Sequence, residues 1–85
     1  MTLAEKFAAA QERVKTLTRR PSNDELLELY ALFKQGTTGD VQGSRPGMFD
    51  LKGRAKYDAW ATKRGWAADR AQQAYVDLVD RLIKG

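Results

Sequence analysis

Apolar residues recur at helical spacing in four stretches of this chain. The first runs from about Leu3 to Leu17, and its apolar residues stand three or four positions apart in a single stripe. The fourth runs from about Ala67 to Ile83 and repeats this spacing. No stretch shows the alternation that is typical of a strand. The pattern therefore predicts an all-α fold, a bundle of four amphipathic helices.

The second stretch begins with a capping box, in which the Ser22 hydroxyl and the Glu25 carboxylate each cap a free backbone N–H. We expect its helix to end near Gly36, which would serve as the C-terminal cap. The apolar face is too wide for one neighbour, so this helix should contact several others. The residues of this face are Leu26, Leu27, Leu29, Tyr30, Leu32 and Phe33.

A glycine-rich loop is expected at residues 37–49, which is long for so small a protein. Loops of this length are usually functional or mobile. We expect this one to be ordered, with Met48 and Phe49 packed onto the core.

The third helix is expected from about Leu51 to Lys63, with Asp50 as its N-cap. Trp60 falls within its apolar stripe and is predicted to be a core residue. Gly53 lies inside the helix, where glycine costs about 1 kcal/mol relative to alanine. It either permits a close approach or is simply tolerated. Gly65 is expected to end the helix in the left-handed conformation.

Aromatic and basic side chains share faces of the second and third helices. Tyr30, Phe33 and Lys34 stand at i, i+3 and i+4, and Lys52 and Lys56 at i, i+4. Ammonium groups beside aromatic rings suit a ligand with phosphates at one end and a flat heterocycle nearby. The ordinary alternative is that the lysines are solvated and the tyrosines half-buried in the core.

Composition narrows the candidate chemistry. The chain has 85 residues, 42% of them hydrophobic, which suits one small globular domain. It has no cysteine and no histidine, which excludes thiolate metal sites and removes the commonest general base and metal ligand. The N-terminus lacks the features of a signal peptide, and no stretch approaches the roughly 20 apolar residues of a membrane span. We therefore expect a cytoplasmic protein.

Three segments of the sequence match a known pattern: Y-A-L-F-K-Q-G-T-T-G-D from Tyr30, R-P-G-M-F-D-L-K-G-R-A-K-Y-D-A-W from Arg45, and A-x-x-A-Y-V from Ala71. With these segments, and with Lys15 and Pro21, the chain resembles the acyl-CoA-binding protein family along nearly its whole length. The resemblance implies a single acyl-CoA-binding domain over residues 1–85, with its four helices in up-down-down-up order.

The family's known properties also suggest what the protein does. Its members are non-enzymatic carriers that bind medium- to long-chain acyl-CoA thioesters in a bowl between the helices. The resemblance implies acyl-CoA as the ligand, no cofactor, no metal and no nucleic-acid partner. It further implies a monomer without stable membrane insertion, open to transient contact with membranes or enzymes.

The resemblance implies ligand contacts at nine positions. Lys34 and Lys56 would lie near the adenosine 3′-phosphate, and Tyr30 would hydrogen-bond a phosphate. Phe33 would lie against the adenine, unless it is a core residue, and Tyr75 would lie near the acyl and pantetheine part. Two further lysines would add positive potential. The nine are Lys15, Tyr30, Ala31, Leu32, Phe33, Lys34, Lys52, Lys56 and Tyr75.

Four positions depart from the family pattern. Phe33 stands where tyrosine is common, so a hydroxyl contact is lost. Tyr57 stands where tryptophan is common, and we expect packing there. Trp66 replaces a small polar cap, which leaves the fourth helix without an obvious N-cap. Gly36, usually alanine, should only loosen the end of the second helix.

Two other functions compete with this one. The formal net charge of +4 and a sequence pI near 9.6 would suit a nucleic-acid-binding domain. The basic residues are scattered, however, rather than gathered on one recognition helix. A hydrolase would need a catalytic acid, and the acids of the central stretch, Asp40, Asp50 and Asp58, have no recognisable partner.

Overall fold

The computed structural model describes all residues from 1 to 85 and contains the four expected helices. They are α1 (Leu3–Arg13), α2 (Asn23–Thr37), α3 (Leu51–Ala61) and α4 (Ala68–Lys84). A short 3-10 turn, η1 (Val14–Thr16), extends α1. The all-α prediction is confirmed. None of the helices combines the length and the apolarity that crossing a bilayer requires.

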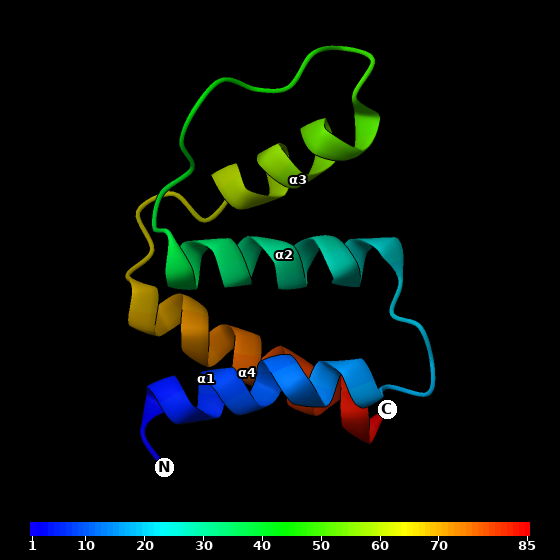
Figure 1. Cartoon of the computed structure of the whole chain (residues 1–85), viewed down its shortest axis with the longest axis vertical. Helices are drawn as coiled ribbons and strands as arrows, with labels where there is room; N and C mark the ends of the chain where they lie inside the picture. The colour runs from blue at the N-terminus through cyan, green and yellow to red at the C-terminus, as the bar shows by residue number, and fades with distance from the viewer.

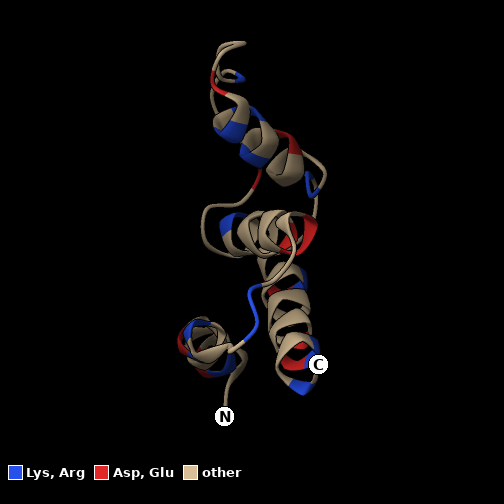
Figure 2. Cartoon of the chain, turned by 90° about the vertical axis from the view of Figure 1, so that its right-hand side faces the viewer, with Lys and Arg blue, Asp and Glu red and all other residues tan.

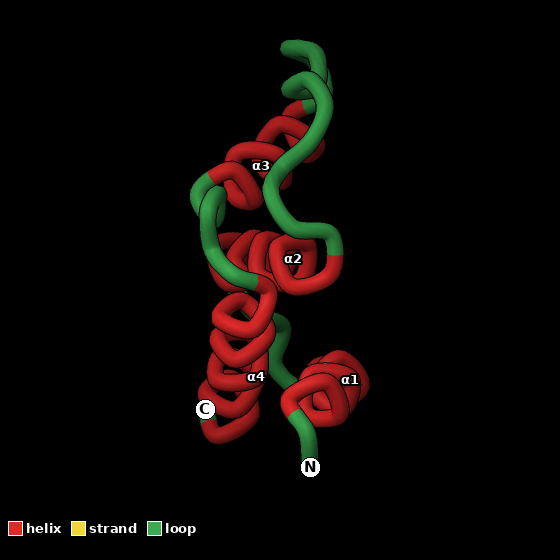
Figure 3. Tube along the Cα trace, turned by 90° about the vertical axis from the view of Figure 1, so that its left-hand side faces the viewer, coloured by secondary structure: helices red, strands yellow, loops and turns green.

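Helix α2 lies at the centre of the bundle. It packs against α3 on one side and against α4 on the other, and α4 in turn packs against α1. In Figure 1, α1 and α4 run in one direction while α2 and α3 run in the other, which is the up-down-down-up order. Figure 3 shows α1 and α4 on one side of α2 and α3 on the opposite side.

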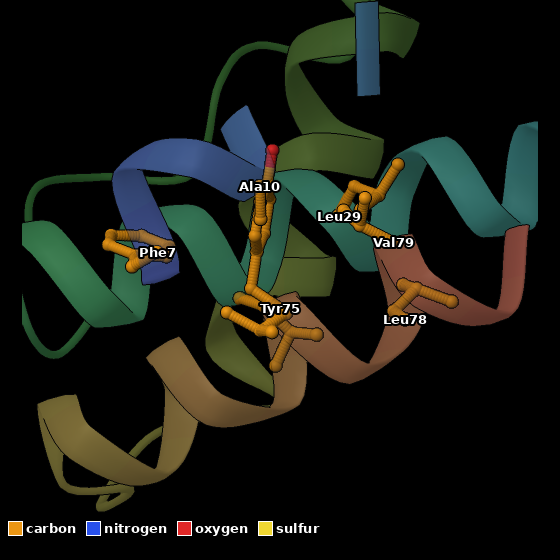
Figure 4. Close-up of a cluster of buried hydrophobic side chains, with 8 residues drawn as sticks. Phe7, Ala10, Leu29, Tyr75, Leu78 and Val79 are labelled. Atoms are coloured by element: carbon orange, nitrogen blue, oxygen red, sulfur yellow. The ribbon is translucent and has the colours of Figure 1, made fainter. Parts of the chain in front are cut away.

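The core lies between α1, α2 and α4 because these helices present their apolar stripes to one another. Figure 4 shows part of this cluster, with Tyr75 extending from α4 toward α1. Trp60 is the buried core residue of α3, as predicted. The cluster consists of Phe7, Ala10, Leu29, Leu32, Tyr75, Val76, Leu78 and Val79. Because α3 packs mainly on α2, this helix stands apart from the main cluster.

The helix starts follow the cap residues of the sequence. The Ser22 hydroxyl accepts a hydrogen bond from the Glu25 N–H at 3.1 Å, and the Glu25 carboxylate accepts one from the Ser22 N–H at 2.8 Å. Asp50 caps α3 by accepting from the Gly53 N–H at 3.0 Å. Both predicted caps are confirmed. A Cβ at Gly53 would collide with the Asp50 carboxylate, so a close approach explains this glycine.

The prediction that Gly36 caps α2 is wrong. The helix continues through Thr37, and the glycine with positive φ is Gly39, at 91°. Gly36 is buried, and a Cβ there would stand 2.9 Å from Cγ of Gln72. The Gln72 side chain also donates to the Gly36 carbonyl at 2.8 Å. This glycine therefore permits close packing of α2 against α4 rather than a change of chain direction.

The long loop lies along α3 and is held there by side chains of that helix. Nε1 of Trp60 donates to the Gly39 carbonyl at 2.7 Å, and the Tyr57 hydroxyl donates to the Gly43 carbonyl at 3.1 Å. Arg45 and Asp58 form two hydrogen bonds, of 2.9 and 2.7 Å. Tyr57 thus ties the loop to the helix through its hydroxyl. The sequence-based expectation of an ordered loop agrees with these contacts.

The expected burial of Met48 and Phe49 is wrong. Their exposed fractions are 67% and 94%. They occupy the two central positions of a turn that a 3.0 Å hydrogen bond from the Asp50 N–H to the Gly47 carbonyl closes. The turn lies directly before α3, and helix α3 packs mainly on α2. Apolar character alone does not bury a residue when the fold provides no surface for it to contact.

A polar network anchors the other end of the loop. Asp40 accepts hydrogen bonds from the Gly65 N–H and from Nε2 of Gln35, each at 2.8 Å. These bonds, the one from Gly65 above all, lower the pKa of the Asp40 carboxyl below its usual value of 3.8. Gly65 has a φ of 88°, as its predicted left-handed conformation requires. The network thus joins the end of α2 to the turn before α4.

Helix α4 starts without a side-chain cap, as the departure at Trp66 suggested. Its N-cap is Ala67, which offers no hydrogen-bonding side chain. The Trp66 indole is half-buried against the core. The Lys63 ammonium lies 4.8 Å from the ring centroid and the Arg70 guanidinium carbon 3.6 Å from it. Packing and cation–π contacts thus fix the residue that replaces a polar cap.

Candidate functional site

Two of the grooves along the first half of α2 are lined by predicted contact residues. The first, which we call the α1–α2 groove, has a volume of about 340 Å³. The second, the α2–α3 groove, has a volume of about 450 Å³. Leu26 lines both of them, so the two grooves meet at this side chain.

The α1–α2 groove is mostly apolar. The end of α1, the connection to α2, α2 itself and α4 all contribute to its walls. Lys15 is its one charged lining residue. The lining residues are Val14, Lys15, Pro21, Leu26, Leu29, Tyr30, Phe33 and Tyr75. Four of the nine predicted contact residues therefore share one groove.

The α2–α3 groove combines apolar walls with basic residues. Its lining residues are Arg20, Asn23, Leu26, Leu27, Leu51, Lys52, Ala55 and Lys56. Two more of the predicted contacts, Lys52 and Lys56, thus lie at this second groove. No acidic residue lines it, which leaves its positive charges available to an anion.

Two cation–π contacts connect helices α2 and α3. Nζ of Lys56, on α3, lies 5.4 Å from the ring centroid of Tyr30, on α2. Nζ of Lys34, on α2, lies 4.9 Å from the ring centroid of Trp60, on α3. In each helix the aromatic residue and the lysine stand four positions apart, so the two pairs lie side by side. The arrangement brings Tyr30, Lys34 and Lys56, three of the predicted contact residues, close together.

Tyr75 forms the α4 side of the α1–α2 groove. Its ring meets that of Phe7 edge to face, with centroids 5.2 Å apart and planes at 86°. The Phe33 ring lies 6.2 Å from Phe7 and 6.5 Å from Tyr75. Burial raises the pKa of the Tyr75 hydroxyl, because the charged form is poorly solvated there. Phe33 is half-buried, so it joins the core cluster while lining the groove.

Four of the predicted contact residues differ in how far they are exposed. Lys15 is exposed, and its ammonium pairs with Glu12 at 3.0 Å. Lys34 is half-buried and lines neither groove. Ala31 and Leu32 have exposed fractions of 0% and 2% and belong to the buried side of α2. Their assignment as ligand contacts, like that of the other seven residues, stays a prediction.

Sequence reasoning missed several groove-lining residues, among them Leu26, Leu29 and Leu51. A signal for the first two was present in the sequence, because the apolar face of α2 was too wide for one neighbour. Part of that face contacts α4 and part lines the grooves. Leu51 gave no such signal, since its position depends on how α3 crosses α2.

The fold and these grooves define a class of protein: a small all-α binding domain with a basic rim and apolar walls. A sequence model of the family described as "Acyl CoA binding protein" matches residues 4–79. The chain belongs to this family. No group of three or more His, Cys, Asp or Glu side chains that could hold a metal ion is present.

Relatives and solved structures agree with this assignment. The chain is 64% identical over 83 residues to "Acyl-CoA-binding protein homolog 1" of Caenorhabditis elegans, covering 98% of this chain and 94% of that one. It is 51% identical over 81 residues to a Drosophila melanogaster homologue, covering 95% and 94%. The crystal structure of acyl-CoA-binding protein 2 from Oryza sativa superposes with a TM-score of 0.92 at 41% identity, covering 96% and 89%.

Proposed function

We propose that residues 1–85 act as a single acyl-CoA-binding domain, which binds medium- to long-chain fatty acyl-CoA esters and carries them within the cell. The protein buffers and delivers the thioester without reacting with it, and needs no cofactor. We further propose that it works as a monomer in the cytoplasm. One observation supports this function above the others: two grooves with apolar walls meet at Leu26, with lysines along their edges.

The apolar walls supply the energy for holding an acyl chain. Each methylene that leaves water contributes about 0.8 kcal/mol, so ten methylenes contribute roughly 8 kcal/mol before the costs of binding. The grooves measure about 450 and 340 Å³. Each lies within the usual size range of small-molecule sites. Long chains should therefore bind far more tightly than coenzyme A alone.

The lysines suit the other end of the ligand. Coenzyme A carries a phosphomonoester and a diphosphate, which lysine ammonium groups bind as point charges. Lys34 and Lys56 already lie over aromatic rings, which limits the entropy that they would lose on binding. Aromatic faces also accept a purine, with roughly 1–3 kcal/mol per stacked base in nucleic-acid complexes. We propose that the nucleotide lies near these two lysines and Tyr30.

The proposed function predicts a clear order of affinities. Titration calorimetry of the whole chain with palmitoyl-CoA, free coenzyme A and palmitate should show one site, with the thioester bound at least a hundredfold more tightly than either fragment. The reason is that only the intact ligand uses both the apolar walls and the lysines. Equal affinity for palmitoyl-CoA and coenzyme A would contradict the role of the grooves. Release of free thiol during the titration would contradict a non-catalytic role.

Replacing Lys56 by alanine should weaken palmitoyl-CoA binding by about 1–3 kcal/mol, because a charge-assisted phosphate contact is lost. The free energy of unfolding should change little, since the Lys56 side chain is exposed. Lys6→Ala is the matched control, an exposed lysine of α1 that lines neither groove. Equal losses of affinity in both variants would mean that overall charge, rather than this site, attracts the ligand.

A nucleic-acid-binding function has weaker support. Figure 2 shows Lys and Arg on several helices, on different sides of the molecule, with acidic residues among them. Sequence-reading proteins usually concentrate their basic residues on one element that enters a groove of the duplex. Lys52 and Lys56 instead line a groove with apolar walls, which a duplex could not enter.

A further inference from the structure

The tip of the molecule exposes three large apolar side chains. Met48, Phe49 and Leu51 have exposed fractions of 67%, 94% and 75%. They lie within four consecutive residues, Met48 and Phe49 in the turn before α3 and Leu51 at its first position, and we call this segment the apolar tip. Single exposed apolar residues are common, but a cluster at a protruding point marks an interaction surface. In Figure 2 this region lies at the end of the molecule farthest from α1 and α4.

The apolar tip is held in place rather than loose. The Asp50 N–H donates to the Gly47 carbonyl at 3.0 Å and closes the turn. The Asp50 carboxylate then caps α3 through the Gly53 N–H. Just before the turn, Arg45 and Asp58 fasten the loop to α3 with two hydrogen bonds. Met48 and Phe49 are therefore presented at a fixed apex, and little conformational entropy would be lost when they contact a partner.

Positive charge lies next to the apolar tip. Lys52 follows directly after Leu51, and both line the α2–α3 groove together with Arg20 and Lys56. The one acid inside the tip, Asp50, is engaged in capping α3. A small apolar projection flanked by cationic side chains is complementary to a bilayer with anionic headgroups, where the apolar groups enter the interface and the lysines contact phosphates.

We propose that the apolar tip docks the protein onto anionic membranes, with Met48 and Phe49 inserted at the level of the headgroups. A protein partner fits less well, because three side chains on a convex apex offer far less than the roughly 1,000 Å² of a stable protein interface. A bilayer needs no matching pocket. Since Leu51 and Lys52 lie at the edge of both the tip and the α2–α3 groove, docking places the mouth of this groove at the lipid surface.

A single introduced cysteine tests the insertion directly, because the chain has none of its own. Phe49→Cys would carry an environment-sensitive nitrobenzoxadiazole label, and Ala8→Cys, exposed on α1, would carry the same label as control. With vesicles of phosphatidylcholine and phosphatidylserine, the label at residue 49 should brighten and shift to the blue, while the control does not change. High salt, or vesicles of phosphatidylcholine alone, should weaken the signal. An unchanged label at residue 49 would overturn the proposal.

Unlabelled variants provide a second test by cosedimentation with the same vesicles. Met48→Ser combined with Phe49→Ser should lower vesicle binding roughly tenfold or more, because the inserted apolar surface is lost. Ile83→Ser is the control, a residue of α4 that is 40% exposed and lies outside the tip. Palmitoyl-CoA affinity of the double variant should equal that of the wild type, since neither residue lines a groove. Equal vesicle binding by the wild type, the double variant and Ile83→Ser would also overturn the proposal. Vesicle binding by the wild type that occurs only when a protein partner is added would overturn it as well.

These tests use vesicles without any acyl-CoA, so their outcome does not depend on the proposed ligand. Loss of vesicle binding with normal palmitoyl-CoA affinity would support docking by the tip. Failure of palmitoyl-CoA to bind would contradict the proposed function and leave the vesicle result unchanged.

Discussion

Replacing Leu26 by glutamine is expected to lower the affinity for palmitoyl-CoA about tenfold to a hundredfold. Leu26 is the one residue that lines both grooves, so a chain that passes from one to the other must contact it. Burying a leucine side chain against the ligand contributes about 1.5–3 kcal/mol. Glutamine has a similar length but adds an amide, whose desolvation beside a hydrocarbon chain costs further free energy.

The length of the ligand chain is the internal control for Leu26→Gln. Affinity for free coenzyme A should stay as in the wild type, because no acyl chain reaches the junction. Calorimetry with acyl-CoA esters of increasing length should then give a shallower rise in affinity for the variant. Leu3→Gln, at a half-buried leucine of α1 that lines neither groove, serves as the matched substitution. A variant that loses coenzyme A and palmitoyl-CoA affinity to the same degree would show that the acyl chain does not cross at Leu26.

Replacing Leu32 by alanine is expected to lower the free energy of unfolding by about 2–5 kcal/mol, the range for deleting a buried leucine. Leu32 is 2% exposed and packs in the core cluster with residues of α1 and α4. Because α2 packs against both α3 and α4, a cavity at this position weakens the centre of the bundle. Domains of this size are stable by roughly 5–15 kcal/mol, so the variant would lose a large share of the total.

Urea denaturation followed by circular dichroism measures the effect of Leu32→Ala. The control is Leu51→Ala, which deletes the same atoms from a side chain that is 75% exposed and should change stability by roughly 0.5 kcal/mol or less. Palmitoyl-CoA affinity of the folded Leu32→Ala protein tests separately whether Leu32 also contacts the ligand, as the resemblance implies. A loss of affinity per folded molecule would support that contact, and wild-type affinity would contradict it.

The helices could be predicted because their signals are local. Spacing of apolar residues, the Ser22–Glu25 capping box and the Asp50 cap each depend on neighbours within one or two turns. The resemblance to the acyl-CoA-binding family added the order of the helices and the expected contact positions, because matching motifs imply matching surroundings. The contact of the Lys56 ammonium with the Tyr30 ring was not predicted, because spacing within one helix cannot show which residues of two helices meet.

The errors came from residues whose environment depends on distant parts of the chain. Gly36 was predicted to be a helix cap because glycine commonly ends helices, but Gln72 of α4 approaches it so closely that no side chain fits. Met48 and Phe49 were predicted to be buried because they are apolar, but the turn that contains them precedes a helix that packs mainly on α2. No window of sequence contains these relations.

The sequence by itself determined the four helices, their caps and the kind of side chains available for binding, because hydrophobic periodicity and capping act over a few residues. Only the tertiary structure decided which face of α2 lies in the core and which lines a groove, and that Leu26 joins the two grooves. It also decided that the tip of α3 stays uncovered. The physical reason is that a residue is buried only if another element covers it. The order of the helices and the angles at which they cross determine which residues are covered.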